Sequence, residues 1–242
     1  KTAYEIASCL VGSEMCIRDS FGPIQNIEYK DVNEPIIQDE SVIINVKSVG
    51  VNFPDGLLVQ GKYQLKPDTP FIPGMEVAGE IVKIGPSVLN LKIGDRVAAL
   101  SQLSGYAEQA VVQEKSVFKI PSKMSFDDSC ALLCAYGTSH YALKQRANLK
   151  KNELLVVLGA SGSTGIAAIQ IGKIMGAKVI AAASTQDKID MCMAHGADEG
   201  FIYPSGDLDR DQQKELSNKI KDCLLYTSPS PRDKRQSRMP SS

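Results

Sequence analysis

The residues with the clearest chemical potential are three glycines spaced three apart, Gly159, Gly162 and Gly165, in the segment LGASGSTG. Glycine permits a tight turn and a close approach of a ligand to the backbone, and a helix beginning here would offer unpaired N–H groups to an anion such as a pyrophosphate. The spacing departs from the commoner GxGxxG because Ala160 and Ser161 intervene. The alternative is a tight turn that only packs a helix closely, so the flanking elements must decide.

The elements around the glycines predict a βαβ unit. LLVVLG at 154–159 is typical of a buried strand, SGSTGIAAIQIGKIMGA of a helix that ends at Gly176, and KVIAAA at 178–183 of a second buried strand. This context favours a dinucleotide site over a packing turn. A further helix in TQDKIDMCMAHGA, a short strand near EGFIY and a polar helix in DQQKELSNKIKD follow, which is roughly half of a six-stranded doubly wound sheet.

The residue after the second strand indicates which dinucleotide is bound. A site that prefers NAD usually has a carboxylate there for the ribose hydroxyls, whereas this chain has Ser184. A 2′-phosphate could accept hydrogen bonds from Ser184 and Thr185 and pair with Lys188, so the sequence favours NADPH. Two alternatives stay open: Asp187 could bond a ribose, and Lys188 could be a solvated helix residue.

The first half of the chain is predicted to be mostly β. SVIINVKSV at 41–49 and the β-branched runs within 76–98 are punctuated by glycine and proline, which suggests a small barrel of short strands. The pattern changes near Pro121, where Ser125 is the expected N-cap of a helix through CALLCAYGTSHYALKQRA. We therefore predict an α/β protein with a β-rich domain at 21–124 and a dinucleotide-binding domain at 125–222.

Composition narrows the class of protein. The 242 residues are 43% hydrophobic and carry a formal charge of −1, which gives no basic field for nucleic acid. No signal-like or membrane-spanning apolar run is recognised. Cys130, Cys134 and Cys192 form no CxxC pair, so neither a disulfide framework nor a cysteine metal site is expected. These features suit a reduced compartment, the cytoplasm, with a mitochondrial location left open.

The two ends of the chain are expected to lie outside the fold. Residues 1–20 lack a periodic pattern, and residues 223–242 are rich in serine, proline and arginine. Both resemble peptides translated from sequencing-adapter sequence, and native disordered tails are the alternative. We expect neither end to carry chemistry.

Several blocks of sequence resemble, in order and spacing, the quinone oxidoreductase-like (zeta-crystallin-like) branch of the zinc-free medium-chain dehydrogenase/reductase superfamily. The blocks are VNFPDGLLVQGKYQ, PFIPGMEVAGEIVKIG, IGDRVAA, AYGTSHYAL, GASGSTGIAAIQIGKIMGAKVIAAAS and HGADEGFIY. The resemblance spans almost all of residues 24–222. It implies a GroES-like catalytic domain, an incomplete Rossmann-like NADPH domain with the active site in the cleft between them, and a homo-oligomer when the chain is complete. This chain is then a fragment.

The resemblance also bears on zinc. Zinc-dependent relatives place a cysteine near Phe53 to Asp55 and a Gly-His-Glu where this chain has Gly74-Met75-Glu76, and neither the cysteine nor the histidine is present. The four-cysteine lobe of those relatives is also missing, and zinc needs at least three protein ligands. We expect no metal, and we expect Cys134, His140 and His195 to be structural.

The resemblance implies roles for individual residues. Asn52 and Tyr63 match positions that line the nicotinamide and substrate cleft, and Thr138 matches a position on the nicotinamide side. Gly162, Ser163 and Thr164 match the phosphate loop, although Ser-Thr replaces the commoner Gly-Val, and Ser184, Lys188 and Tyr203 match positions around the adenosine 2′-phosphate. The structural alternatives are a turn before Pro54 for Asn52, a packed aromatic for Tyr63 and a bond to its own helix for Thr138.

The implied reaction is hydride transfer from NADPH to a quinone or a similar electron-poor carbonyl compound, with Asn52 and Tyr63 polarising or positioning the acceptor. The cofactor supplies the chemistry, and no dedicated acid or base is required for a quinone. Two alternatives remain. One is an enone or enoyl-thioester reductase with a proton donor such as Tyr63, and the other is a crystallin-like protein that binds NADPH without turnover.

Overall fold

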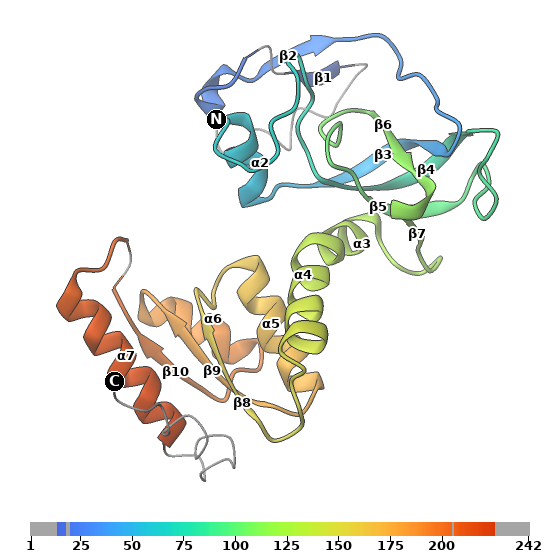
Figure 1. The fold of residues 1–242 in the computed structure, drawn as a ribbon. Helices are drawn as coiled ribbons and strands as arrows, with labels where there is room; N and C mark the ends of the chain where they lie inside the picture. Colours follow the sequence, from blue (N-terminus) through green and yellow to red (C-terminus); the bar gives the residue numbers. More distant parts are fainter. Residues whose placement is uncertain (1–13, 18–19, 205, 226–242) are drawn as a thin grey trace, which may run out of the picture. The chain divides into compact units, whose positions relative to one another are not determined.

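The computed structural model describes residues 14–17, 20–204 and 206–225. They form two compact units, which divide between Gly137 and Thr138 (Figure 1). Each unit is built around its own sheet. Most of the predicted tails, 1–20 and 223–242, falls outside the described residues, but Glu14–Ile17 forms a strand and the last helix continues to Leu225, so these parts belong to the fold.

Unit 1 contains a five-stranded antiparallel sheet in the order β6-β3-β4-β5-β7 (Figure 1). Its strands are β3 (Ser41–Gly50), β4 (Glu76–Ile84), β5 (Arg96–Leu100), β6 (Gln109–Gln113) and β7 (Val117–Lys119). The strands predicted from 41–49 and within 76–98 are thereby confirmed. In the register of β3 and β4, Gly50 lies opposite Glu76.

Side chains pack against both faces of this sheet. One face forms a core of aliphatic side chains, chiefly Val42, Ile44, Val77, Ile81, Val97, Ala99, Ala110 and Val112. The small residues Ala78 and Ala98 point to the other face, where Cys130 of α3 (Phe126–Ala131) packs against them. Successive side chains of a strand point to opposite faces, so neighbours such as Val77 and Ala78 serve different layers.

Shorter elements complete unit 1. They are β1 (Glu14–Ile17), η1 (Ile24–Asn26), β2 (Glu28–Asp31), α2 (Phe53–Val59) and η2 (Glu114–Ser116). The backbone of β1 pairs antiparallel with β2, with Glu14 opposite Asp31. The sequence of 14–17 shows no strand alternation, but ladder pairing uses only backbone groups and does not require it.

One helical segment crosses from unit 1 into unit 2. It comprises α3, the π-type turns η3 (Leu132–Tyr136) and η4 (Tyr141–Arg146), and α4 (Gly137–His140) between them. Ser125 is the N-cap as predicted, since its Oγ accepts a hydrogen bond from the Asp128 N–H at 3.0 Å. The predicted domain boundary at 124/125 differs from the division at Gly137 and Thr138, because α3 packs against β3 and β4 of unit 1.

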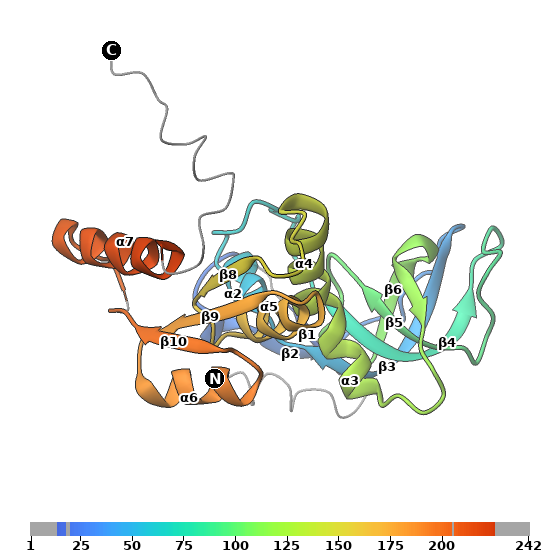
Figure 2. The ribbon, with the colours of Figure 1, turned by 90° about the horizontal axis from the view of Figure 1, so that it is seen from below.

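Unit 2 is an α/β layer with a three-stranded parallel sheet in the order β10-β9-β8. Its elements are β8 (Leu154–Leu158), α5 (Ser163–Ile174), β9 (Lys178–Ala183), α6 (Gln186–Ala194), β10 (Glu199–Ile202) and α7 (Arg210–Leu225). The predicted βαβ unit and the helices and strand after it are confirmed. Figure 2 shows α6 and α7 on opposite sides of the sheet.

The core of unit 2 joins the sheet to its helices. Val157, Val179 and Ala181 of the strands pack with Ile169 of α5 and Cys192 of α6. Helix α5 ends where the glycine signal predicted, because Gly176 adopts a φ of +81° and lets the chain turn into β9. Among the helices that the structure describes, none is both long enough and apolar enough to cross a membrane.

Candidate functional site

The glycine loop joins β8 to α5 in unit 2. Gly159 has a φ of +62°, which favours glycine, and no described atom lies within 4 Å of the place where its Cβ would be. At Gly165 a Cβ would lie 2.5 Å from the Ala160 carbonyl oxygen, so the first turn of α5 packs directly on the loop. Gly162 is the extended N-cap, and the N–H groups of Ser163 and Thr164 belong to the helix end that lacks intrahelical acceptors. This end can bind an anion.

The side chains predicted around an adenosine phosphate lie at the same edge of the parallel sheet. Tyr203 follows β10, and its Oη accepts a hydrogen bond from the Gly159 N–H at 3.2 Å. Ser184 follows β9, and its Oγ accepts a hydrogen bond from Lys188 Nζ at 3.0 Å. Ligands of parallel α/β sheets bind outside the carboxyl ends of the strands, which is where these groups meet. Asp187 is exposed in the first turn of α6.

Thr138 lies on α4 in unit 2 and is exposed. The next residue, Ser139, is buried and donates a hydrogen bond from its Oγ to the Thr164 carbonyl at 2.8 Å. This bond ties α4 to the first turn of α5. The structure therefore holds Thr138 on an element anchored to the glycine loop.

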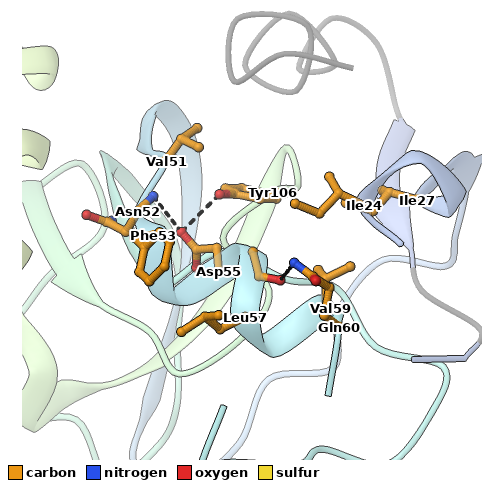
Figure 3. Close-up of a pocket in the computed structure, with 11 residues that line it drawn as sticks. Ile24, Ile27, Val51, Asn52, Phe53, Asp55, Leu57, Val59, Gln60 and Tyr106 are labelled. Carbon is orange, nitrogen blue, oxygen red and sulfur yellow. Dashed lines mark hydrogen bonds between the residues drawn. The ribbon is translucent and has the colours of Figure 1, made fainter. Parts of the chain in front are cut away.

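Asn52 is the N-cap of α2 in unit 1, and two buried carboxylates, Asp55 and Glu76, accept hydrogen bonds from it. Figure 3 shows the hydrogen bond to Asp55. Its backbone N–H donates to Asp55 Oδ2 at 2.8 Å, and the Tyr106 hydroxyl donates to the same oxygen at 3.0 Å. Its side-chain Nδ2 donates to Glu76 Oε1 at 2.8 Å. The second oxygen of Glu76 accepts the backbone N–H of Cys134 at 2.7 Å. These contacts form a single polar network within unit 1.

The local sequence explains why Glu76 can be buried. Glu76 begins β4 opposite Gly50, the last residue of β3, and a Cβ at Gly50 would overlap the Glu76 carboxylate. Only glycine leaves that space. Asp55 and Glu76 are 2% and 3% exposed, so each carboxylate loses its water on burial. Hydrogen bonds reach both oxygens of Glu76, whereas Asp55 accepts them only at Oδ2, and its buried Oδ1 has no hydrogen-bond partner among the described residues.

The pKa values of the carboxyl groups in this network and of the thiol beside it are raised. Burial raises the pKa of Asp55 from 3.8 to about 6, although the hydrogen bonds from Asn52 and Tyr106 oppose the shift. Burial also raises the pKa of Glu76, against the hydrogen bonds from Asn52 and Cys134. Burial and then the charges of Glu76 and Asp55 raise the pKa of the Cys134 thiol, which favours the protonated form over a thiolate.

A pocket of about 320 Å³ opens beside this network. Among the residues that the structure describes, those that line the pocket are mainly apolar and include no lysine or arginine. They are Ile24, Ile27, Val51, Asn52, Phe53, Asp55, Gly56, Leu57, Val59, Gln60 and Tyr106 (Figure 3). Tyr63 is half-buried in the segment after α2 and is not one of the lining residues. Of the residues predicted for the acceptor, Asn52 alone lines this pocket.

Sequence reasoning missed Asp55, Glu76 and Tyr106. A signal existed for Asp55, which is an acidic residue three positions after a helix N-cap, where it can accept the N-cap N–H. Glu76 stands at the head of an apolar strand, which could have indicated a buried and partnered charge. Tyr106 lies 51 residues beyond Asp55 in the chain, and no local pattern links the two.

The arrangement of potential metal ligands bears on the zinc prediction. Within the described residues, no group of three or more histidine, cysteine, aspartate or glutamate side chains is arranged to hold a metal ion. His195 is exposed and its Nδ1 lies 3.2 Å from Gln170 Nε2. The absence of zinc stays a prediction.

The β-rich unit is similar to a known domain. Residues 38–122 match the alcohol dehydrogenase GroES-like domain. Quinone oxidoreductase-like protein 2 of Rattus norvegicus is 37% identical over 193 residues, which cover 79% of this chain and 55% of that protein.

Solved structures extend the likeness across both units. A probable oxidoreductase from Mycobacterium abscessus is 34% identical with a TM-score of 0.75, over 87% of this chain and 66% of that one. The quinone oxidoreductase of Thermus thermophilus, solved also in complex with NADPH, is 32% identical with a TM-score of 0.68, over 77% and 59% of the two chains. The chain belongs to the quinone oxidoreductase-like medium-chain dehydrogenases/reductases. It spans about half the length of the curated quinone oxidoreductase-like relatives it matches.

Membership of this quinone oxidoreductase-like family accounts for the two kinds of sheet. The antiparallel sheet of unit 1 is the GroES-like part, and the parallel sheet of unit 2 is the Rossmann-like part. The predicted fold class is thereby confirmed.

Gly50→Ala should destabilise unit 1, because the added Cβ displaces the Glu76 carboxylate and breaks its hydrogen bonds to Asn52 and Cys134. We expect a loss of about 2–4 kcal/mol in the free energy of unfolding, measured by urea denaturation. Gly137→Ala is the matched control, since a Cβ there meets no described atom within 4 Å and alanine favours a helix. Equal stability of the two variants would contradict this account of Gly50.

Asp55 should make stability depend on pH. Its folded-state pKa of about 6 lies above its ordinary value of 3.8, so the folded protein holds this proton more tightly and the free energy of unfolding falls as pH rises between these values. The loss is about 2–3 kcal/mol. Asp55→Asn keeps an acceptor for Asn52 and Tyr106 but cannot titrate, so it should lack this loss.

The measurement for Asp55 is the difference between the urea-unfolding free energies of wild type and Asp55→Asn across that pH range. Asp187→Asn serves as the control because Asp187 is exposed. A wild-type curve that runs parallel to that of Asp55→Asn would show that burial does not perturb this carboxyl.

Proposed function

We propose that the protein is an NADPH-dependent oxidoreductase that transfers a hydride to a quinone or similar electron-poor carbonyl compound without zinc. The proposal rests on the groups at the carboxyl ends of the unit 2 strands, where the glycine loop, Ser184, Lys188 and Tyr203 lie. The start of α5, which can bind an anion, suits the pyrophosphate of NADPH, and the end of β9, which is uncharged and lies next to Lys188, suits its 2′-phosphate.

The residues present fit the cofactor. The open space at Gly159 and the N–H groups at the start of α5 suit the pyrophosphate, with Ser163 and Thr164 contributing through their backbone. The Ser184 hydroxyl and Lys188 would hold the 2′-phosphate, and their existing 3.0 Å contact already places the two groups together. When bound, NADPH supplies the hydride. In this proposal Thr138 and Asn52 orient the nicotinamide and the acceptor.

The pocket beside Asn52 supports an uncharged, largely apolar acceptor. Its described lining contains the Asp55 carboxyl and no cationic side chain, so it is unsuited to an anionic acceptor. A quinone meets this requirement, and it takes up the hydride and a solvent proton to give a hydroquinone. Relatives named quinone oxidoreductase support the same class of acceptor.

A second candidate is an enone or enoyl-thioester reductase, which needs a proton donor for the carbon next to the reduced one. Tyr63 would be that donor; it is half-buried in unit 1 but does not line the pocket beside Asn52, which favours the quinone reaction over this one. The proposal also includes the homo-oligomeric state expected for the family, which sedimentation of the full-length protein would test. The third alternative is a protein that binds NADPH but catalyses no reaction.

Lys188→Ala should weaken NADPH binding about 10- to 100-fold, because a charge-assisted contact to the 2′-phosphate is lost, and should leave NADH binding within about twofold. The measurement is titration of the 242-residue chain with each cofactor, following nicotinamide fluorescence. Asp187→Ala is the neighbouring control and should not lower NADPH affinity. Loss of NADH binding in Asp187→Ala, with no effect of Lys188→Ala, would instead assign the site to NADH.

Turnover separates the candidate reactions. With NADPH present, a quinone should be reduced faster than an enone of similar size, as followed by loss of NADPH absorbance, and the rate should survive a metal chelator. Tyr63→Phe should leave quinone reduction within about threefold, because no dedicated proton donor is required. A preference for the enone that Tyr63→Phe abolishes would establish the second candidate instead.

A further inference from the structure

A buried hydroxyl contacts the first turn of the helix that follows the glycine loop. Ser139 lies on α4, is 3% exposed, and donates a hydrogen bond from its Oγ to the Thr164 carbonyl at 2.8 Å. Thr164 is the second residue of α5. A helical carbonyl accepts the N–H four residues further along and has a second lone pair for another donor. The hydrogen bond from Ser139 is therefore additional to those that form α5.

The Thr164 carbonyl belongs to the same peptide group as the Gly165 N–H. The peptide bond between the two residues is trans, so its C=O and N–H lie in one plane and point in opposite directions. In α5 the carbonyl points along the helix, and the N–H points back toward the start of the helix. A contact that fixes the Thr164 carbonyl therefore also fixes the direction of the Gly165 N–H.

The Gly165 N–H is one of the donors that this helix start offers to an anion. The Ile166 N–H donates to the Gly162 carbonyl at 2.8 Å, and the N–H groups of residues 163–165 come before this first turn of the helical ladder. They have no acceptor within the helix. A hydroxyl that donates to a carbonyl polarises the whole peptide group, so the N–H at its other end becomes a stronger donor.

We propose that Ser139 is a positioning residue for the pyrophosphate of the cofactor. Its hydroxyl aligns and polarises the Thr164–Gly165 peptide group, which directs the Gly165 N–H at the phosphate oxygens. This inference rests on the proposed function in taking the start of α5 as the pyrophosphate site. Ser139 itself does not contact the cofactor, and it does not select between NADH and NADPH, since both carry the pyrophosphate.

Ser139→Ala should weaken a ligand that carries a 5′-diphosphate and spare one that carries only a 2′-phosphate. The probes are ADP and adenosine 2′-monophosphate, titrated calorimetrically into the 242-residue chain. ADP should bind about three- to tenfold more weakly to the variant, because the hydrogen bond that aligns the donor is lost. Affinity for adenosine 2′-monophosphate should stay within about twofold, because separate sites contribute independently. A general loss of structure would weaken both probes.

Ser129→Ala is the matched control. Ser129 is also buried, and its Oγ donates to the Phe126 carbonyl at 2.9 Å in unit 1. The control thus loses the same kind of hydrogen bond and should keep wild-type affinity for both probes.

Ser139→Cys is a second variant that keeps the proposal testable if Ser139→Ala does not fold. A thiol is close in size to a hydroxyl but is a weaker donor. This variant should also lose affinity for ADP, by a smaller factor than Ser139→Ala, and should keep its affinity for adenosine 2′-monophosphate.

Wild-type affinity for ADP in Ser139→Ala or Ser139→Cys would overturn the proposal. An equal loss for both probes, a loss of ADP affinity in Ser129→Ala, or no binding of ADP to the wild type would overturn it as well. Failure of the proposed function gives a different result. If Ser139→Ala weakens ADP selectively but NADPH reduces no quinone, the role of Ser139 stands and the proposed reaction fails.

Discussion

The burial of the Glu76 carboxylate is the constraint on which the rest of unit 1 depends. A charge that is 3% exposed must be fully hydrogen-bonded, and its two oxygens take donors from the N-cap of α2 and from the π-type turns after α3. It also requires a missing side chain at Gly50 on the neighbouring strand. One carboxylate thus determines where three separate segments meet, and Asn52 lies at that meeting point. Asp55 secures the same residue from its backbone side.

Unit 2 relies on a different physical device. Its glycine loop and helix end are backbone features, and the groups around them, Ser184, Lys188 and Tyr203, come from the ends of two parallel strands and the helix between them. Parallel strands gather their carboxyl ends at one edge, so residues from distant parts of the sequence meet there. Backbone N–H groups suit the pyrophosphate, which NADH and NADPH share. Side chains suit the 2′-phosphate, which only NADPH carries.

Much of unit 2 could be predicted because its signals are local. The βαβ pattern, the glycine spacing and Gly176 at the helix end each lie within a few residues, and the structure confirms those elements. The network around Asn52 could not be predicted in the same way. Glu76 is 24 residues from Asn52, and Tyr106 is 51 residues from Asp55, so these contacts depend on strand register and packing. The division at Gly137 was also not predictable, because a continuous helical pattern does not reveal that α3 packs against β3 and β4.

The central claim, that unit 2 binds NADPH through the glycine loop and the end of β9, is tested most directly by a crystal structure of the chain soaked with NADPH. We expect electron density for the pyrophosphate within hydrogen-bond distance of the backbone amides at the start of α5, and for the 2′-phosphate beside Ser184 and Lys188. A cofactor whose pyrophosphate lies away from the loop, or whose 2′-phosphate turns from both side chains into solvent, would contradict the account.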